Sequence, residues 1–352
     1  MDRSFLRSAA PSDFERRLAD RPDIAAYSDF RGDRLYAYGQ LLAEQQLAEL
    51  RGELDRLGVL LYLDLPVGVN PNGFDAHCRP DLHLTGIHVG APPDPVFADG
   101  QDWQFPPMSP TRSRAEGHRF FARCLRHQMR IADYLRIDHF MSMHRLFWIP
   151  ASMPSSAGMY VDYPSDELYA VLCAESHINR CRVVGEDLGT VPDHVRSKMR
   201  RHGVSCMHLV EYELDAVDKP LAGPQSGDFG GLNTHDMAPF AAFWRDAGAA
   251  RRARLMSYLD SVGHAPAGDD AGDVLDCLLD AASDWDTIAT VVSLEDLWLE
   301  TEPQNVPGST GEQRPNWRRR FPRTLDEIAG DPIVSERLAR LFAPSKPARN
   351  SS

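Results

Sequence analysis

The sequence predicts an α/β fold of the TIM-type (β/α)8 barrel class, on two observations. Helical patterns alternate with short apolar runs typical of strands, and most of these runs end in a charged residue. Because the carboxyl ends of parallel strands meet at one mouth of a barrel, charge at those ends indicates a functional face. A doubly wound open sheet is the competing architecture. The sequence contains neither a G-x-G-x-x-G turn nor a P-loop to support it.

The composition limits the classes of partner. Of 352 residues, 43% are hydrophobic and 25% charged, as in a globular protein, and the formal net charge is −13. This acidity argues against nucleic acid or an anionic membrane as the main partner, since both attract basic surfaces. No signal-peptide core or membrane-length apolar run is present, so we expect a cytoplasmic location. The six cysteines form no C-x-x-C pair and are expected to be reduced.

The first helix and strand are predicted close together. Apolar residues recur at three- and four-residue steps from Ala43 to Leu57, which predicts a helix with one buried face, and Gly58 is a helix stop. The continuous apolar run 59–63 follows and ends in Asp64. It is predicted to be a strand covered on both faces, as in a parallel sheet.

A long segment rich in proline and aromatic residues covers residues 89–109 and includes Trp103. A loop of this length inside a compact domain is usually functional, as a lid or a binding loop. A solvated connection stiffened by proline is an equal alternative on this evidence alone.

The predicted strands number six: 59–64, 135–139, 182–187, 206–212, 230–234 and 288–294. Because strand side chains alternate between faces, Arg136 and Asp138 are expected on one face of the second of them. A closed barrel of this class needs eight strands, so the count predicts an incomplete barrel.

Acids at the strand ends are the candidate catalytic residues. Asp138 and Glu186 follow neighbouring strands and are placed to face each other, as the two carboxyl groups of glycoside chemistry do. Arg136 would hold Asp138 ionised, which suits a nucleophile. Glu186 has no such neighbour in sequence and lies near other acids, which favours the protonated form of a proton donor. Asp236, beside His235, would be a third acid that holds sugar hydroxyls.

Two alternatives remain open at this point. An isolated acid at a strand end is more often a helix cap or a solvated residue, by roughly three to one, although four of them (Asp64, Asp138, Glu186 and Asp236) on one framework weaken that interpretation. A divalent metal site is the other alternative, because carboxylates and histidines also bind metals. No H-E-x-x-H or similar ligand spacing is present, so we expect no metal.

Several motifs resemble, in their order, those of the 4-α-glucanotransferases, glycoside hydrolase family 77. They are Asp64-Leu65-Pro66, residues 90–94 and 100–103, Arg136-Ile137-Asp138-His139, residues 185–189, Asn233-Thr234-His235-Asp236, residues 294–297 and residues 302–308. The resemblance runs from about Tyr36 to Arg320. It implies retaining transfer of α-1,4-glucan segments between maltooligosaccharides through a covalent glucosyl-enzyme, with a glucan donor and acceptor as partners and no cofactor. The oligomeric state stays open.

The resemblance also implies roles for single residues. Asp138 would be the nucleophile, Glu186 the acid/base, and Asp236 the third essential acid that helps to distort the sugar. The residues implied to bind the substrate are Asp64, Trp103, Arg136, His139 and His235. Among these, Trp103 would be a sugar platform or a lid.

The expected domain plan has three parts: an N-terminal helical segment (1–35), the catalytic barrel portion (36–320) and a C-terminal helix with a disordered tail (321–352). The family's first two barrel strands have no counterpart in residues 1–35, so we expect a truncated member of the family. A catalytically impaired remnant that still binds glucan is the alternative function. The basic stretch 316–320 is predicted to be a solvated patch.

Overall fold

The computed structural model describes residues 16–31, 34–93, 97–189, 191–215, 220–309 and 313–342. The chain divides into two compact units. Unit 1 consists of residues 1–186 with 201–204, and unit 2 of residues 187–200 with 205–352. The expected disordered tail lies, from residue 343 on, outside the described residues.

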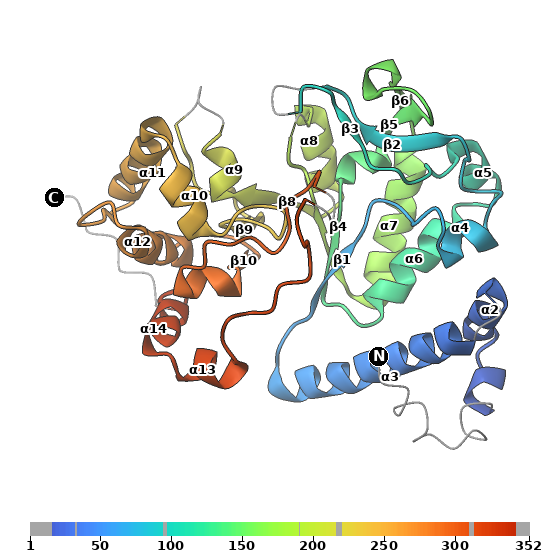
Figure 1. Ribbon diagram of the computed structural model, residues 1–352, viewed down its shortest axis with the longest axis horizontal. Coiled ribbons are helices and arrows are strands. Elements are labelled where there is room, and N and C mark those ends of the chain that lie inside the picture. The colour runs from blue at the N-terminus through green and yellow to red at the C-terminus, as the bar shows by residue number, and fades with distance from the viewer. Residues whose placement is uncertain are drawn as a thin grey trace. The chain divides into compact units, whose positions relative to one another are not determined.

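Unit 1 alternates helices with parallel strands and carries a second, antiparallel sheet (Figure 1). Its helices are α2 (Pro22–Arg31), α3 (Arg34–Leu57), α4 (Phe74–Cys78), α5 (Pro110–Ala115), α6 (Arg119–Met129) and α7 (Ser165–Asn179), with short 3-10 helices η2 (Phe140–Met143) and η3 (Ser155–Ala157). Its strands are β1 (Tyr62–Leu65), β2 (Ile87–Ala91), β3 (Gln101–Asp102), β4 (Tyr134–Ile137), β5 (Arg145–Pro150), β6 (Met159–Asp162) and β7 (Arg182–Gly185).

The parallel strands of unit 1 follow the order β1-β4-β7, and the predicted strands 59–64, 135–139 and 182–187 are confirmed within a few residues. The start of the first was wrong. Val59 and Leu60 precede β1 and are 46% and 61% exposed, so they are not covered on both faces. The carbonyl of Val59 accepts a hydrogen bond from Arg51 Nη2 at 3.3 Å and not from a neighbouring strand.

The predicted buried face of the first helix is wrong over its second half. Figure 1 shows α3 as the long helix that leads into β1. Its buried residues are Ala37 and Leu41, which pack with Leu18 and Ile24, whereas Leu50 and Leu57 are exposed. Periodicity reports that a helix has an apolar face and not what covers it.

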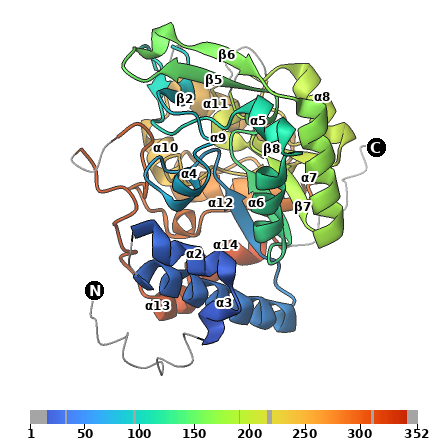
Figure 2. The ribbon, with the colours of Figure 1, turned by 90° about the vertical axis from the view of Figure 1, so that its right-hand side faces the viewer.

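The segment 89–109 was expected to be a loop, but part of it is regular structure. Its first residues belong to β2 and its middle to β3, in an antiparallel sheet of order β3-β2-β5-β6. Figure 2 shows β2, β5 and β6 lying together. The sequence analysis missed β5 and β6, because their pairing joins residues as distant as Gly90 and Phe147. Residues 94–96 of this segment lie outside the described residues.

Unit 2 also contains parallel strands, in the order β8-β9-β10. The strands are β8 (Val204–Leu209), β9 (Phe229–Gly231) and β10 (Ala289–Val291). The helices are α8 (Asp193–Arg201), α9 (Val210–Glu213), α10 (Phe240–Asp246), α11 (Ala249–Ser261), α12 (Ala271–Ser283), α13 (Leu325–Gly330) and α14 (Pro332–Arg340), with the 3-10 helix η4 (Leu294–Trp298). The strands predicted at 206–212, 230–234 and 288–294 are thus confirmed in place, but their bounds differ. All three end three residues earlier than predicted, β8 and β9 also begin earlier, and residues 210–212 belong to the helix α9.

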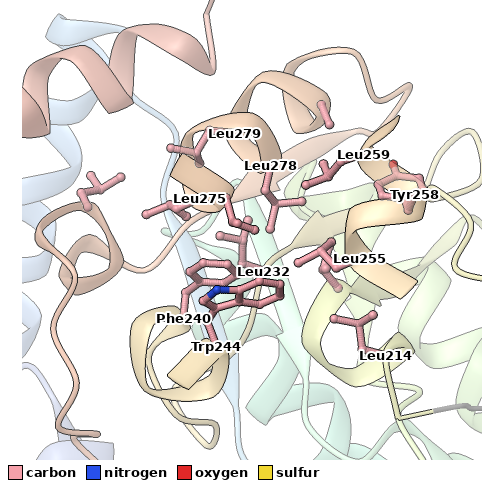
Figure 3. Packing of buried hydrophobic residues seen from close by; sticks show 14 of the residues in the cluster. Leu214, Leu232, Phe240, Trp244, Leu255, Tyr258, Leu259, Leu275, Leu278 and Leu279 are labelled. Atoms are coloured by element: carbon pink, nitrogen blue, oxygen red, sulfur yellow. The ribbon is translucent and has the colours of Figure 1, made fainter. Parts of the chain in front are cut away.

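The core of unit 2 is built from α10, α11 and α12 against the strands (Figure 3). Phe240 and Trp244 stack at 6.2 Å between ring centroids, and leucines of α11 and α12 surround them. The Trp244 indole donates to the carbonyl of Asp269 at 2.7 Å, so its one polar atom is satisfied. Each such fully buried apolar side chain stabilises a fold by about 1.5–3 kcal/mol.

Candidate active site

The register of the parallel sheet in unit 1 brings the ends of β4 and β7 to one level. Ile137 is paired with Gly185, and Asp138 and Glu186 come directly after them. The Glu186 N–H donates to the carbonyl of Ile137 at 3.0 Å. The Phe140 N–H donates to the carbonyl of Glu186 at 2.9 Å. The two predicted catalytic acids of this unit therefore follow neighbouring strands that remain hydrogen-bonded past their ends.

Arg136 bridges two of the predicted acids. Its Nη1 donates to both carboxylate oxygens of Asp64 at 2.8 Å, and its Nη2 lies 2.9 Å from Oδ1 of Asp138. The arginine side chain is 7% exposed, whereas those of Asp64 and Asp138 are 38% and 31% exposed. Burial disfavours the charged guanidinium, but the three surrounding carboxylates outweigh it and raise the pKa of Arg136. The predicted contact between Arg136 and Asp138 is present.

Glu186 is held by the turn that follows Asp138. The backbone N–H of His139 donates to Oε2 of Glu186 at 2.9 Å. His139 has a φ of 44°, a left-handed conformation that is uncommon outside glycine. The sequence shows no cation near Glu186, yet the charge of Glu186 is among those that raise the pKa of Arg136. The bond from His139 and this charge effect could not be predicted from the sequence, because the first uses a backbone group and the second acts between two strands.

Trp103 lies against His139, as a residue that covers the site would. The ring centroids are 5.2 Å apart and the rings are nearly perpendicular, at 79°. The backbone N–H of Trp103 donates to the carbonyl of Val89 at 3.0 Å, and its indole donates to Gln101 at 3.2 Å. Burial lowers the pKa of His139, with Asp138 opposing, so its imidazole is neutral at pH 7.

A cavity of about 890 Å³ in unit 1 reaches Asp138. Its wall near that residue includes Leu65 and the following loop to Asn70, together with Phe105. Phe105 lies so close to Gly68 that a Cβ there would be 2.2 Å from its ring. Neither Gly68 nor Phe105 was among the predicted site residues, although the aromatic content of the segment 89–109 could have indicated Phe105.

The remaining predicted site residues, His235 and Asp236, belong to unit 2. Nε2 of His235 lies 3.3 Å from Oδ2 of Asp236, and Nδ2 of Asn305 donates to Oδ1 of Asp236 at 2.7 Å. The ring of Trp317 lies 5.5 Å from that of His235 between centroids. Asn305 and Trp317 were not among the predicted site residues.

The stretch 316–320 is more than the solvated patch that was predicted. Nδ2 of Asn316 donates to the hydroxyl of Ser309 at 2.9 Å, and its Oδ1 accepts from the N–H of Val306 at 3.2 Å. Arg319 lies 3.6 Å from Glu300. Contacts with residues seven or more positions away therefore fix this stretch, and such contacts leave no local pattern.

Unit 2 also holds a buried polar network past the ends of its parallel strands. Nδ2 of Asn233 donates to Oε1 of Glu211 at 3.0 Å and to Oδ2 of Asp296 at 2.9 Å. Oδ1 of Asn233 accepts from the hydroxyl of Ser293 at 2.8 Å, and Oδ1 of Asp296 accepts from the N–H of Phe240 at 2.7 Å. Burial raises the pKa of Glu211 well above its usual value and raises that of Asp296 to about 6. The sequence analysis did not single out Glu211, although it is another acid that closely follows a strand.

Among the described residues, no group of three or more histidine, cysteine, aspartate or glutamate side chains could hold a metal ion. In the same part of the chain, no helix has the length and apolar character needed to cross a membrane. The six cysteines are free.

Comparison with known proteins places these features in context. A model of the 4-alpha-glucanotransferase family matches residues 10–325. The 4-alpha-glucanotransferase of Haemophilus influenzae is 36% identical over 214 residues, which are 60% of this chain and 31% of that protein. That of Mycobacterium tuberculosis is 30% identical over 335 residues, which are 86% of this chain and 46% of that protein. The chain therefore spans less than half the length of these two relatives.

Among solved structures, the amylomaltase of Corynebacterium glutamicum superposes with a TM-score of 0.77 at 25% sequence identity. The match covers 88% of this chain and 50% of that one. Together with the parallel strands of both units, this likeness fits the predicted α/β fold of an incomplete TIM-type barrel.

Proposed function

Because the chain belongs to the 4-alpha-glucanotransferase family, glycoside hydrolase family 77, we propose that it transfers α-1,4-glucan segments between maltooligosaccharides. The observation that carries the proposal is the arrangement around Arg136. A buried guanidinium contacts Asp138 at 2.9 Å, and that aspartate lines a cavity large enough for sugar residues. The proposed partners are a glucan donor and a glucan acceptor, and the proposed location is cytoplasmic.

In the first step, Oδ of Asp138 attacks the anomeric carbon of the donor glucan. A bond forms between that oxygen and C1, and the bond between C1 and the leaving 4-oxygen breaks while Glu186 gives that oxygen its proton. In the second step, Glu186 takes the proton from the 4-hydroxyl of an acceptor glucan. That hydroxyl attacks C1 and releases Asp138, so two inversions give net retention. The contact with Arg136 holds the Asp138 carboxylate in place between turnovers.

His139 and Trp103 support transfer over hydrolysis in this proposal. A neutral imidazole both donates and accepts hydrogen bonds, which suits the hydroxyls of a sugar. The Trp103 indole against it presents an apolar surface to a glucose ring and excludes water from the intermediate. Asp64 fixes Arg136 from the other side and belongs to the same ring of polar groups.

We assign Asp236 the role of the third acid, with His235 as a further sugar contact. The bond from Asn305 orients the Asp236 carboxylate, and an oriented carboxylate is what recognition of sugar hydroxyls requires.

The test is incubation with maltotriose. Glucose together with a ladder of longer maltooligosaccharides is the expected product pattern, whereas glucose and maltose alone would indicate hydrolysis. Asp138→Asn and Glu186→Gln should each lower transfer by on the order of 10³-fold or more, since each removes a group that acts on the reacting bond. Thermal melts of both variants check that the fold is retained.

Asp162→Asn is the matched control, because Asp162 is an exposed acid in the antiparallel sheet of the same unit. Most of the activity should remain in this variant. Retention of most activity in Asp138→Asn or Glu186→Gln would refute the assignment of that residue. Binding of maltoheptaose by the unaltered chain without any product would instead indicate the alternative function, a remnant that binds glucan without turnover.

A further inference from the structure

Trp317 is an exposed aromatic residue in an unusual backbone conformation. Its φ is 60° and the residue is 60% exposed. A bulky residue in the left-handed region is strained, and such strain persists only where the surroundings impose it, most often at functional sites. An aromatic ring that is both strained and turned to solvent needs a reason other than packing.

Hydrogen bonds to the loop 304–309 impose this conformation. The backbone N–H of Trp317 donates to the carbonyl of Gln304 at 2.9 Å. The side chain of its neighbour Asn316 bonds to Val306 and to Ser309 of the same loop. The backbone from which the indole projects is therefore fixed by this loop.

The same loop fixes Asp236. Asn305, which directly follows Gln304, donates to Oδ1 of Asp236 at 2.7 Å. His235 lies between the acid and the indole, with its Nε2 3.3 Å from Asp236 and its ring 5.5 Å from that of Trp317. Two consecutive loop residues thus hold an aromatic ring and a carboxylate in one arrangement.

We propose that Trp317 is a sugar-binding residue whose indole stacks on the glucose ring that Asp236 and His235 bind by its hydroxyls. A pyranose ring presents C–H groups on its face and hydroxyls at its rim. An aromatic face suits the first and a carboxylate with an imidazole suits the second. The inference rests on the proposed glucan substrate and adds to it a contact that the sequence motifs did not assign.

The experiment measures binding of maltoheptaose to the full chain by isothermal titration calorimetry, with thermal melts to check the fold. Trp317→Ala should weaken binding by roughly tenfold, because it removes the stacking surface. Trp317→Phe should stay within about threefold of the unaltered chain, since a smaller aromatic face remains. Phe342→Ala is the matched control, an aromatic residue of the same unit that is 83% exposed, and it should leave binding unchanged.

Unaltered binding by a folded Trp317→Ala variant would overturn the inference, as would absence of maltoheptaose binding by the unaltered chain. Equal losses in Trp317→Ala and Trp317→Phe would also overturn it, because they would mean that backbone strain and not the aromatic face matters. The outcome is separable from that of the proposed function, since titrations repeated in the Asp138→Asn background, where no glucosyl-enzyme can form, report binding without turnover. A chain that binds glucan through Trp317 but forms no transfer products would refute the proposed function and leave the role of Trp317 standing.

Discussion

Both units have acids at or beyond the carboxyl ends of their parallel strands, but the surroundings of these acids differ between the units. In unit 1, a buried guanidinium contacts Asp64 and Asp138, and the latter opens onto a cavity. In unit 2, Glu211 and Asp296 are buried, and the amide of Asn233 joins them. An acid at a strand end is therefore available for chemistry where a cation contacts it and a cavity gives access. Where the acid is fully buried, as at Glu211 and Asp296, burial raises its pKa and the acid becomes part of the framework.

The largest effect is expected from turning the amide in unit 2 into a third acid. Asn233→Asp keeps the shape but removes the two N–H donors that Glu211 and Asp296 share. We expect a loss of about 3–5 kcal/mol in the free energy of unfolding at pH 7, because buried acceptors are left without donors. Part of the loss should be recovered at pH 5, where the acids bind protons.

Urea unfolding at the two pH values measures this change. The exposed Asn72→Asp serves as control, since it makes the same chemical change at the surface and should shift stability by less than about 0.5 kcal/mol. A variant Asn233→Asp as stable as the unaltered chain at pH 7 would show that the network contributes little to the fold.

A smaller loss of stability, with a large loss of activity, is expected in unit 1. Arg136→Met removes the cation between Asp64 and Asp138, which should cost about 1–2 kcal/mol. This is less than for a fully buried pair, because the two aspartates are partly exposed and water screens them. Transfer from maltotriose should fall by about 10²-fold, since Asp138 loses the group that holds its carboxylate in place.

Initial rates of product formation, together with thermal melts, check this prediction. Arg56→Met is the control, because Arg56 forms an exposed ion pair with Glu53 on α3 and should change neither quantity. If both variants lost activity equally, the contrast between the two kinds of strand end would lose its basis.

The smallest effect is expected from neutralising a buried acid in unit 2. Burial raises the pKa of Glu211 in the folded chain, so folding takes up a proton there. The stability that this group contributes is greatest at low pH and is lost as the pH rises from the unfolded pKa through the folded one. Glu211→Gln removes that loss, and the variant should be as stable as the unaltered chain at pH 7 or more stable by about 1 kcal/mol.

The measurement is the difference in unfolding free energy between Glu211→Gln and the unaltered chain from pH 4 to pH 8. The difference should move in favour of the variant as the pH rises. An exposed change of the same kind, Glu53→Gln, should show no such trend. A trend in the opposite direction would mean that Glu211 is stabilised as a carboxylate.

The sequence was sufficient to predict the places of the parallel strands and the contact of Arg136 with Asp138. Both follow from local rules, an apolar run that ends in charge and the alternation of side chains along a strand. It did not predict the antiparallel sheet, because the pairing of Gly90 with Phe147 depends on distant contacts. The hydrogen bond from the His139 N–H to Glu186 could not be predicted for another reason, since it depends on a left-handed turn at a residue other than glycine.

Burial was the second property that the sequence did not reveal. Glu211 and Asp138 both follow apolar runs, so their positions in the sequence are similar. In the structure, however, Glu211 is buried and Asp138 lines a cavity. The exposed Leu57 on α3 shows the same limit for apolar residues. What surrounds a side chain is set by the whole fold, and a local pattern records only the preference of the side chain itself.

Asp133 sits at the opposite end of the sheet from the acids, yet their alignment depends on it. Its Oδ2 accepts from the N–H of Leu61 at 2.7 Å, and its own N–H donates to the carbonyl of Leu61 at 2.9 Å. These two hydrogen bonds join the starts of the two strands and hold the register in which Asp64 lies beside Arg136. Side chains alternate, so a slip of one residue would turn Asp64 to the other face of the sheet. The segment from Leu61 to Asp64 thus works as a spacer of fixed length, and one residue inserted within it would remove Asp64 from the site without changing any residue of the site itself.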